Sequence, residues 1–450
     1  MDLTLHPAAA QSIDAKGTNI LACVEKLKLS MENRSPAFQT ERVVSANITD
    51  KDIIGEPHVW LQDANGQRVL AFIHRDDGAY GFTSESYSLI EGLSDEIFKA
   101  RWARDFLSKT FIENTILEWC CVSFKSGGRS GLANSLVSQS TKAIRKFTVW
   151  APIAHLDVEA PFNFGPAQIA PITTAMFDNL ENKSVENSPQ HADNIKAHFS
   201  KLRKTMQGRA AVVLEIEAER DYAYEKGWMI AADVVGLLRF LSPSSFRFWI
   251  VCPNALLGAE LIPKAHALLL EDDGSFSAKS KIVPKDIAFW RLSASEIAAM
   301  QNTGLSELGG LVSENQLNQF QQRLRACILA YTKGTTFSDV ADRLVYACSA
   351  LEGLLLKNTS EPIKQNLGER MAFLLAKEPD QRIEIVNNVG KIYDMRSQYI
   401  HHRISKMEET DLNMFTINAH ATFIRALKDM LRFSSAPEFI GAIDRLKFGG

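Results

Sequence analysis

The sequence has no apolar run that could cross a membrane: none of its 450 residues belong to an uninterrupted apolar stretch of about 18 residues. The longest candidate, MIAADVVGLLRFL, contains Asp233 and Arg239, and we interpret it as a buried helix. The first residues, MDLTLHPAAAQSIDAKG, have no basic start and no sustained apolar run, which argues against a signal peptide. We therefore expect a cytoplasmic protein that does not contact a membrane.

Patterns for metal and phosphate binding are missing too. The six cysteines are scattered and none belongs to a CxxC pair, so neither a zinc site nor a disulfide framework is indicated. The glycine-rich GGRSG, residues 127–131, lacks the lysine and Ser/Thr of a phosphate-binding loop and predicts a flexible turn. The C-terminal half has no Asp/Glu cluster with the spacing of metal ligands. We expect no metal and no cofactor.

An excess of basic charge is also absent. The sequence has 50 Lys and Arg against 53 Asp and Glu, a formal net charge of −3, so any nucleic-acid site must be a local positive cleft. The hydrophobic fraction of 46% and charged fraction of 23% are ordinary for a globular protein. A chain of this length predicts two or three domains.

The N-terminal two-thirds of the chain predicts strands mixed with helices. Residues 1–175 are interpreted as a β-rich domain, because HVWLQDANGQRVLAFIHR places Asn65-Gly66 between two alternating segments, a hairpin signal. ILEWCCVSF and KFTVWAPI are further strand candidates, whereas SDEIFKARWARDFLSK favours a helix or an exposed amphipathic segment. Residues 176–310 predict a mixed α/β segment that could belong to the same sensor region. It holds a helix ending at Gly208, strands at RAAVVLEIEAE and FRFWIVC, and a helix over residues 221–241.

Residues 311–450 predict a different, all-helical architecture. Apolar residues recur there at helical spacing, and short connections between such helices favour an antiparallel bundle. The fold class predicted for the whole chain is therefore α+β, with a β-rich or mixed N-terminal region before a C-terminal all-α bundle. The predicted helices begin at five positions: Ser313, Ser338, Pro362, Asp380 and Thr410.

The stretch KIYDMRSQYIHHR, residues 391–403, ends the fourth of these helices with a basic cluster. On an ideal helix His401 is rotated about 140° from Arg396, so both side chains reach one site only if the helix unwinds or bends near its end. Cleavage of RNA by its own 2′-hydroxyl needs a base that titrates near neutral pH and a fixed cation beside the phosphate. A histidine and an arginine meet these needs without a metal. The alternative is structural, because Arg and His near a helix C-terminus interact well with the helix dipole.

RLVYACSALEGLLL, LGERMAFLLA and VGKIYDMRSQYIHHR together resemble the HEPN superfamily (higher eukaryote and prokaryote nucleotide-binding domains). The resemblance is greatest to the ApeA-type branch of bacterial anti-phage defence proteins. It covers roughly residues 311–435, and its most specific part is the Arg-x4-His motif from Arg396 to His401. No motif of the N-terminal two-thirds matches a family.

The resemblance implies a helical bundle that forms a homodimer or higher homo-oligomer and brings two such motifs together. Active members are metal-independent endoribonucleases. His401 would then be the base or acid and Arg396 would hold the scissile phosphate. This chain has Ser397 where the family often has asparagine, and His402 where it often has glycine. His401 is favoured as the catalytic imidazole, with His402 as the alternative.

Two further residues are candidates for supporting roles. Glu352 lies within an apolar helix and is expected to pair with Arg396 or Arg370, as in similar proteins, or to be a surface glutamate between leucines. Tyr399 could stack on an RNA base, or simply pack against the bundle.

The sequence thus predicts an endoribonuclease that binds RNA, a regulated toxin or antiviral effector of abortive infection, with an unknown trigger acting on its N-terminal region. The alternative is a catalytically silent HEPN dimerisation module attached to a ligand- or partner-binding region. A weaker third hypothesis is a toxin that a separate nucleotidyltransferase modifies near Tyr399.

Overall fold

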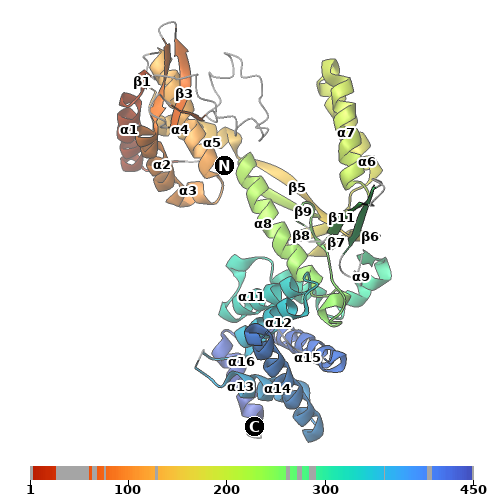
Figure 1. Cartoon of the computed structure of the whole chain (residues 1–450). Helices are drawn as coiled ribbons and strands as arrows, with labels where there is room; N and C mark the ends of the chain where they lie inside the picture. Colours follow the sequence, from red (N-terminus) through yellow and green to blue (C-terminus); the bar gives the residue numbers. More distant parts are fainter. Residues whose placement is uncertain are drawn as a thin grey trace. The chain divides into compact units, whose positions relative to one another are not determined.

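The computed structural model describes residues 4–26, 60–62, 68–75, 78–126, 130–259, 264–270, 276–282, 290–358, 360–402 and 408–447. For residues 60–62, 68–75, 78–79, 84, 126, 264–270, 276–282, 314 and 400–402 it describes the backbone alone. The chain divides into two compact units (Figure 1). Unit 1 comprises Met1–Phe147 and Glu215–Lys226, and unit 2 comprises Thr148–Leu214 and Gly227–Gly450. The predicted domain boundaries near residues 175 and 310 remain predictions.

Unit 1 combines helices with an antiparallel sheet in the strand order β1-β4-β3-β2. Its core is formed by fully buried side chains such as Phe82, Ile90 and Ile112. The helices are α1 (Pro7–Ala22), α2 (Ser84–Lys99), α3 (Arg101–Arg104), α4 (Lys109–Ser126) and α5 (Leu132–Ala143). The strands are β1 (Glu25–Lys26), β2 (Trp60–Gln62), β3 (Arg68–Arg75) and β4 (Gly78–Thr83).

The expectation of a β-rich N-terminal region is only partly correct. β2 pairs antiparallel with β3, with Gln62 opposite Arg68, as the hairpin prediction requires; Asn65-Gly66 itself lies outside the described residues. The strand predicted at ILEWCCVSF was wrong, because this stretch belongs to α4. Ile112, Ile116 and Cys120 recur every four residues and are all fully buried, so the helical period governs the segment. SDEIFKARWARDFLSK forms the end of α2 and all of α3, as predicted.

Unit 2 contains most of a sheet in the strand order β10-β5-β9-β8-β7, a parallel pair β6–β13 and an antiparallel pair β11–β12. The strands are β5 (Arg145–Ala154), β6 (Leu156–Val158), β7 (Phe162–Phe164), β8 (Ala167–Pro171), β9 (Ala210–Ala218), β10 (Ala255–Leu256), β11 (Lys264–Leu270), β12 (Phe276–Ile282) and β13 (Trp290–Leu292). The helices that accompany them are α6 (Thr174–Asn187), α7 (Ala192–Met206), α8 (Arg220–Arg239), α9 (Ala294–Gln301) and α10 (Leu305–Gly310). The start of β5, the end of β9 and the start of α8 belong to unit 1.

Most predictions for this region are confirmed. KFTVWAPI lies in β5 and RAAVVLEIEAE in β9, while α7 and α8 are the two predicted helices. The strand predicted at FRFWIVC was wrong, because residues 246–252 form turns and irregular backbone with a single bridge residue, Val251. The buried guanidinium of Arg343 holds this segment through the carbonyls of Ser244 and Ile250, and it lies 4.9 Å from the ring centroid of Phe248. A long-range contact thus decides the conformation there.

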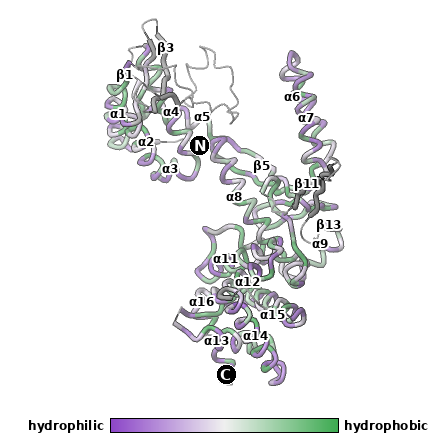
Figure 2. The backbone as a smooth tube through the Cα atoms, in the orientation of Figure 1, coloured by the Kyte–Doolittle hydropathy of each residue, from purple (hydrophilic) through white to green (hydrophobic). Residues whose placement is uncertain are grey.

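The C-terminal region is all-helical, as predicted, and the whole fold is mixed α+β. Apolar and polar residues recur along each of its helices (Figure 2), and the apolar residues supply a core that includes Phe320, Leu351 and Phe415. Among the described residues, no helix is both long and apolar enough to cross a bilayer. The helices are α11 (Gln319–Gly334), α12 (Val340–Leu355), α13 (Ile363–Leu375), α14 (Pro379–His402), α15 (Glu409–Lys428) and α16 (Ala436–Lys447).

Details of these helices differ from the prediction. The cap of α11 is Asn318, which forms a capping box with Gln321, and not Ser313. Ile363 of α13 and Ile383 of α14 follow the apolar period of their helices, yet they are 36% and 58% exposed.

Candidate functional site

An ion pair joins α12 and α14 at the position that the sequence singled out. Nη1 of Arg396 lies 2.7 Å from Oε1 of Glu352, and each of the two side chains is 22% exposed. Glu352 is thus neither an isolated surface glutamate nor the partner of Arg370. The pairing of Glu352 with Arg396 is confirmed.

Tyr393 completes this cluster from the same helix as Arg396. Its hydroxyl donates to the same Glu352 oxygen over 2.8 Å, and its ring centroid lies 5.7 Å from the guanidinium carbon of Arg396. The tyrosine and the arginine are three positions apart, a spacing that places two side chains on one helix face. The Glu352 carboxylate therefore orients both groups.

The buried thiol of Cys348 lies next to this cluster and is unreactive. Cys348 lies one turn before Glu352 on α12 and is fully buried. Burial raises the pKa of the Cys348 thiol to about 12, although the nearby charge of Arg396 acts in the opposite direction. Burial also raises the pKa of Tyr393, and the negative charge of the Glu352 carboxylate adds to that shift. Both groups therefore stay protonated near neutral pH, which makes Cys348 a poor nucleophile.

Part of the Arg396 guanidinium remains available. Nη1 is its only nitrogen with a hydrogen-bond acceptor among the described residues, and Nε is buried without a partner. A guanidinium offers five N–H donors in a planar fork that suits phosphate oxygens. A partly exposed arginine held from one side by a carboxylate can hold an anion on its other side.

The remaining predicted residues lie near the end of α14. Ser397 is exposed and Tyr399 is half-buried. His401 and His402 are the last two residues of α14, and their side chains lie outside the described residues. The α14 backbone stays helical as far as His402, so it does not unwind between Arg396 and His401. Unwinding of the helix, which would let Arg396 and His401 of one chain reach the same site, is therefore not seen in the backbone up to His402.

Arg370 belongs to a separate network. It is 2% exposed, and it pairs with Glu361 over 2.8 Å and with Asp444 over 3.0 Å. It also donates to the carbonyl of Leu355 at the end of α12. This network fastens α13 to α16 and to the end of α12, which is a structural role.

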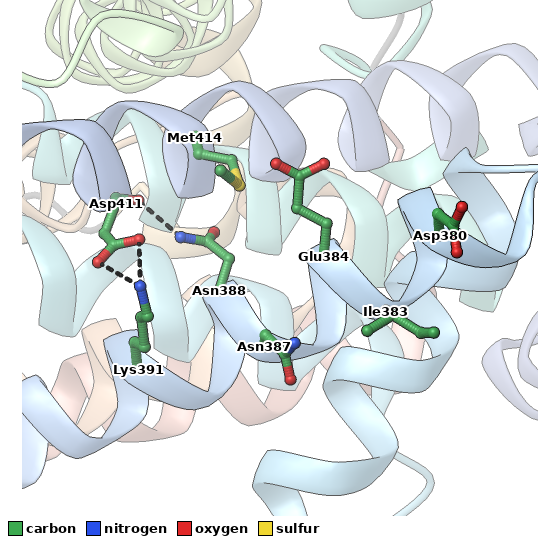
Figure 3. Close-up of a pocket in the computed structure, with 8 residues that line it drawn as sticks. All are labelled: Asp380, Ile383, Glu384, Asn387, Asn388, Lys391, Asp411 and Met414. Carbon is green, nitrogen blue, oxygen red and sulfur yellow. Dashed lines mark hydrogen bonds and ion pairs between the residues drawn. The ribbon is translucent and has the colours of Figure 1, made fainter.

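Sequence reasoning missed two members of the cluster, Tyr393 and Cys348. Helical spacing could have identified both. Cys348 precedes Glu352 by four positions and Tyr393 precedes Arg396 by three, so each shares a helix face with a residue already singled out. Sequence reasoning also missed a pocket of about 440 Å³ between α14 and α15 (Figure 3). Within the described ranges, no group of His, Cys, Asp or Glu is arranged to hold a metal ion.

Comparisons with known proteins found no similarity to this chain: no protein-family model matches it, and neither does any curated protein or solved structure.

Proposed function

We propose that the C-terminal helices form a HEPN-type, metal-independent endoribonuclease in which Arg396 binds the scissile phosphate. The observation that carries the proposal is the Glu352–Arg396 ion pair beside Tyr393 at a partly exposed position, within the sequence motif that resembles the family. A purely structural arginine is usually satisfied by its neighbours and withdrawn from solvent, as Arg370 is.

In this proposal the 2′-hydroxyl oxygen of a ribose attacks the adjacent phosphorus and forms a 2′,3′-cyclic phosphate. The bond from phosphorus to the 5′-oxygen of the next nucleotide breaks, and that oxygen leaves with a proton from the imidazolium or from water. His401, or alternatively His402, removes the proton of the 2′-hydroxyl, since an ordinary imidazole titrates near pH 6.5. Arg396 stabilises the negative charge that develops on the phosphate oxygens, and Glu352 keeps its guanidinium in position. Ser397 and Tyr399 follow Arg396 on α14 and could contact the ribose or a base.

Because α14 stays helical to His402, the imidazole that acts with Arg396 is best supplied by a second copy of the chain. We propose a homodimer that pairs Arg396 of one protomer with the histidine of its partner. The N-terminal region would keep the enzyme inactive until a trigger arrives, because an unrestrained ribonuclease would damage its own cell. Such a protein fits a toxin or an anti-phage effector.

The second candidate function is a catalytically silent dimerisation module. The observation in its favour is that Arg396 is already engaged by Glu352, so phosphate binding must share the guanidinium or displace the carboxylate. The two candidates make opposite predictions for RNA cleavage.

The test incubates the purified full chain with total RNA in EDTA. Cleavage should persist in chelator and disappear in Arg396→Ala and His401→Ala, while His402→Ala reports on the alternative imidazole. Arg432→Ala is the matched control, because that side chain is 68% exposed on a short turn after α15. Since an inactive preparation could reflect a missing trigger, growth after induced expression is measured in parallel. Intact RNA and unaffected growth for the parent chain would favour the silent module.

Mixing two inactive variants tests where the imidazole comes from. A dimer of one Arg396→Ala subunit and one His401→Ala subunit keeps a single intact pair if the pair spans two protomers. It keeps none if the pair lies within one chain. Recovery of activity on co-expression supports the shared site, and continued inactivity contradicts it.

A further inference from the structure

A pocket of about 440 Å³ lies between α14 and α15, three turns before Arg396 on α14. It is within the size range of small-molecule sites. Ile383 from α14 and Met414 from α15 supply its apolar lining. Figure 3 shows the carboxylate of Glu384 pointing from α14 toward α15.

The charges around this pocket do not balance. Asp411 is neutralised by Lys391, whose Nζ lies 3.1 Å from both carboxylate oxygens. Asp380 and Glu384 also line the pocket, and neither has a cation within ion-pair distance among the described residues. Two negative charges therefore remain, which disfavours an anionic occupant and favours a cationic one.

A second and independent feature is a buried amide with one unused acceptor. Asn388 lines the pocket and is only 2% exposed. Its Nδ2 donates to the backbone carbonyl of Asp411 over 2.9 Å, whereas its Oδ1 has no donor. Figure 3 shows this amide between the Lys391–Asp411 pair and Glu384. Buried polar atoms are nearly always hydrogen-bonded, so a free acceptor at a pocket indicates a missing donor.

We propose that this pocket binds a small organic cation, a primary alkyl amine of the diamine or polyamine class. An ammonium group has three donors and no acceptor, which complements Oδ1 of Asn388 and the carboxylates of Glu384 and Asp380. The alkyl stem lies against Ile383 and Met414. The described residues hold no group of ligands suited to a metal ion, which separates this site from a metal site. The proposal does not depend on RNA cleavage.

Calorimetric titration of the full chain tests the proposal, with 1,4-diaminobutane and spermidine as probes. Butan-1-ol and butyrate are the neutral and anionic controls of similar shape. We expect both amines to bind at up to millimolar concentration and neither control to bind. Glu384→Lys places an ammonium in the pocket and should weaken amine binding at least about tenfold.

Glu378→Lys is the matched control, because it makes the same charge change at an exposed residue that precedes α14 and does not line the pocket. Its affinity should stay close to that of the parent chain. Glu384→Gln removes one charge with little change in shape, so it reports the same loss should Glu384→Lys fail to fold. Equal affinity in the parent and Glu384→Gln, or no amine binding by the parent, would overturn the proposal.

Discussion

The Glu352–Arg396 pair yields a quantitative prediction about the candidate site. Each residue is replaced by alanine, alone and together, in a double-mutant cycle. The pair is joined over 2.7 Å, and 22% of each side chain is exposed. If the carboxylate orients the arginine, the two substitutions must be strongly coupled.

The magnitude follows from the partial burial. Two unit charges about 4 Å apart attract by roughly 4 kcal/mol at an effective dielectric constant near 20. Desolvation offsets much of this attraction, which leaves a coupling energy of about 1–3 kcal/mol. Glu352→Ala also removes the acceptor of the Tyr393 hydroxyl, so this single change should cost about 2–4 kcal/mol in total.

Hydrogen exchange followed by mass spectrometry is the suitable assay, because a chain with two units need not unfold in one step. Peptides from α12 and α14 report the free energy of local opening around the pair. The internal control is the Lys364–Asp394 pair, which also involves α14 but has side chains that are 52% and 61% exposed. Exposed pairs contribute about 0–1 kcal/mol. A Glu352–Arg396 coupling no larger than that of Lys364–Asp394 would refute the reasoning.

Two further predictions concern the same bundle. Arg370→Met should destabilise the C-terminal helices by about 3 kcal/mol, because it leaves Glu361 and Asp444 without their buried guanidinium, and thermal unfolding measures the loss. Burial raises the pKa of Asp444, but hydrogen bonds from Arg370 and a lysine outweigh that effect and lower it to about 2. The stabilisation is therefore complete above the ordinary value of about 4 and is lost as pH falls toward 2, so the parent and Arg370→Met should converge in that range. Cys348, whose pKa burial raises to about 12, should resist iodoacetamide in the folded chain and react only after unfolding, whereas the partly exposed Cys23 serves as the reactive reference. Rapid alkylation of folded Cys348 would show that the cluster opens.

The C-terminal helices could be predicted because their information is local. Apolar residues such as Leu324, Leu351 and Phe415 recur at helical spacing and are fully buried in the structure. The ends were less predictable, since several polar residues near a helix start can serve as its cap. Ser313 was predicted to begin α11, but the cap is Asn318, whose side-chain amide also donates to the carbonyl of Phe433.

The N-terminal region was harder to predict because its apolar runs are ambiguous between helix and strand. ILEWCCVSF is rich in residues that favour strands, yet it is helical, with one face buried in the hydrophobic core of unit 1. FRFWIVC is also rich in such residues, and Arg343, nearly a hundred positions later, holds it in an irregular conformation through the carbonyl of Ile250. Neither outcome can be deduced from a short window of sequence.

The candidate site shows the same division between local and long-range information. The motif drew attention to Arg396, and its pairing with Glu352 agrees with the expectation from similar proteins. The position of an imidazole relative to that arginine depends on what α14 does after Tyr399. A continuous helix separates Arg396 from His401 by about 140° and from His402 by about 120° in the other direction. On a continuous helix neither histidine position lies on the face of Arg396, and for this reason the proposal takes the imidazole from a partner protomer. The ribonuclease proposal and the dimer proposal are therefore tied together: if the chain cleaves RNA as a monomer, the roles assigned to these residues must be revised.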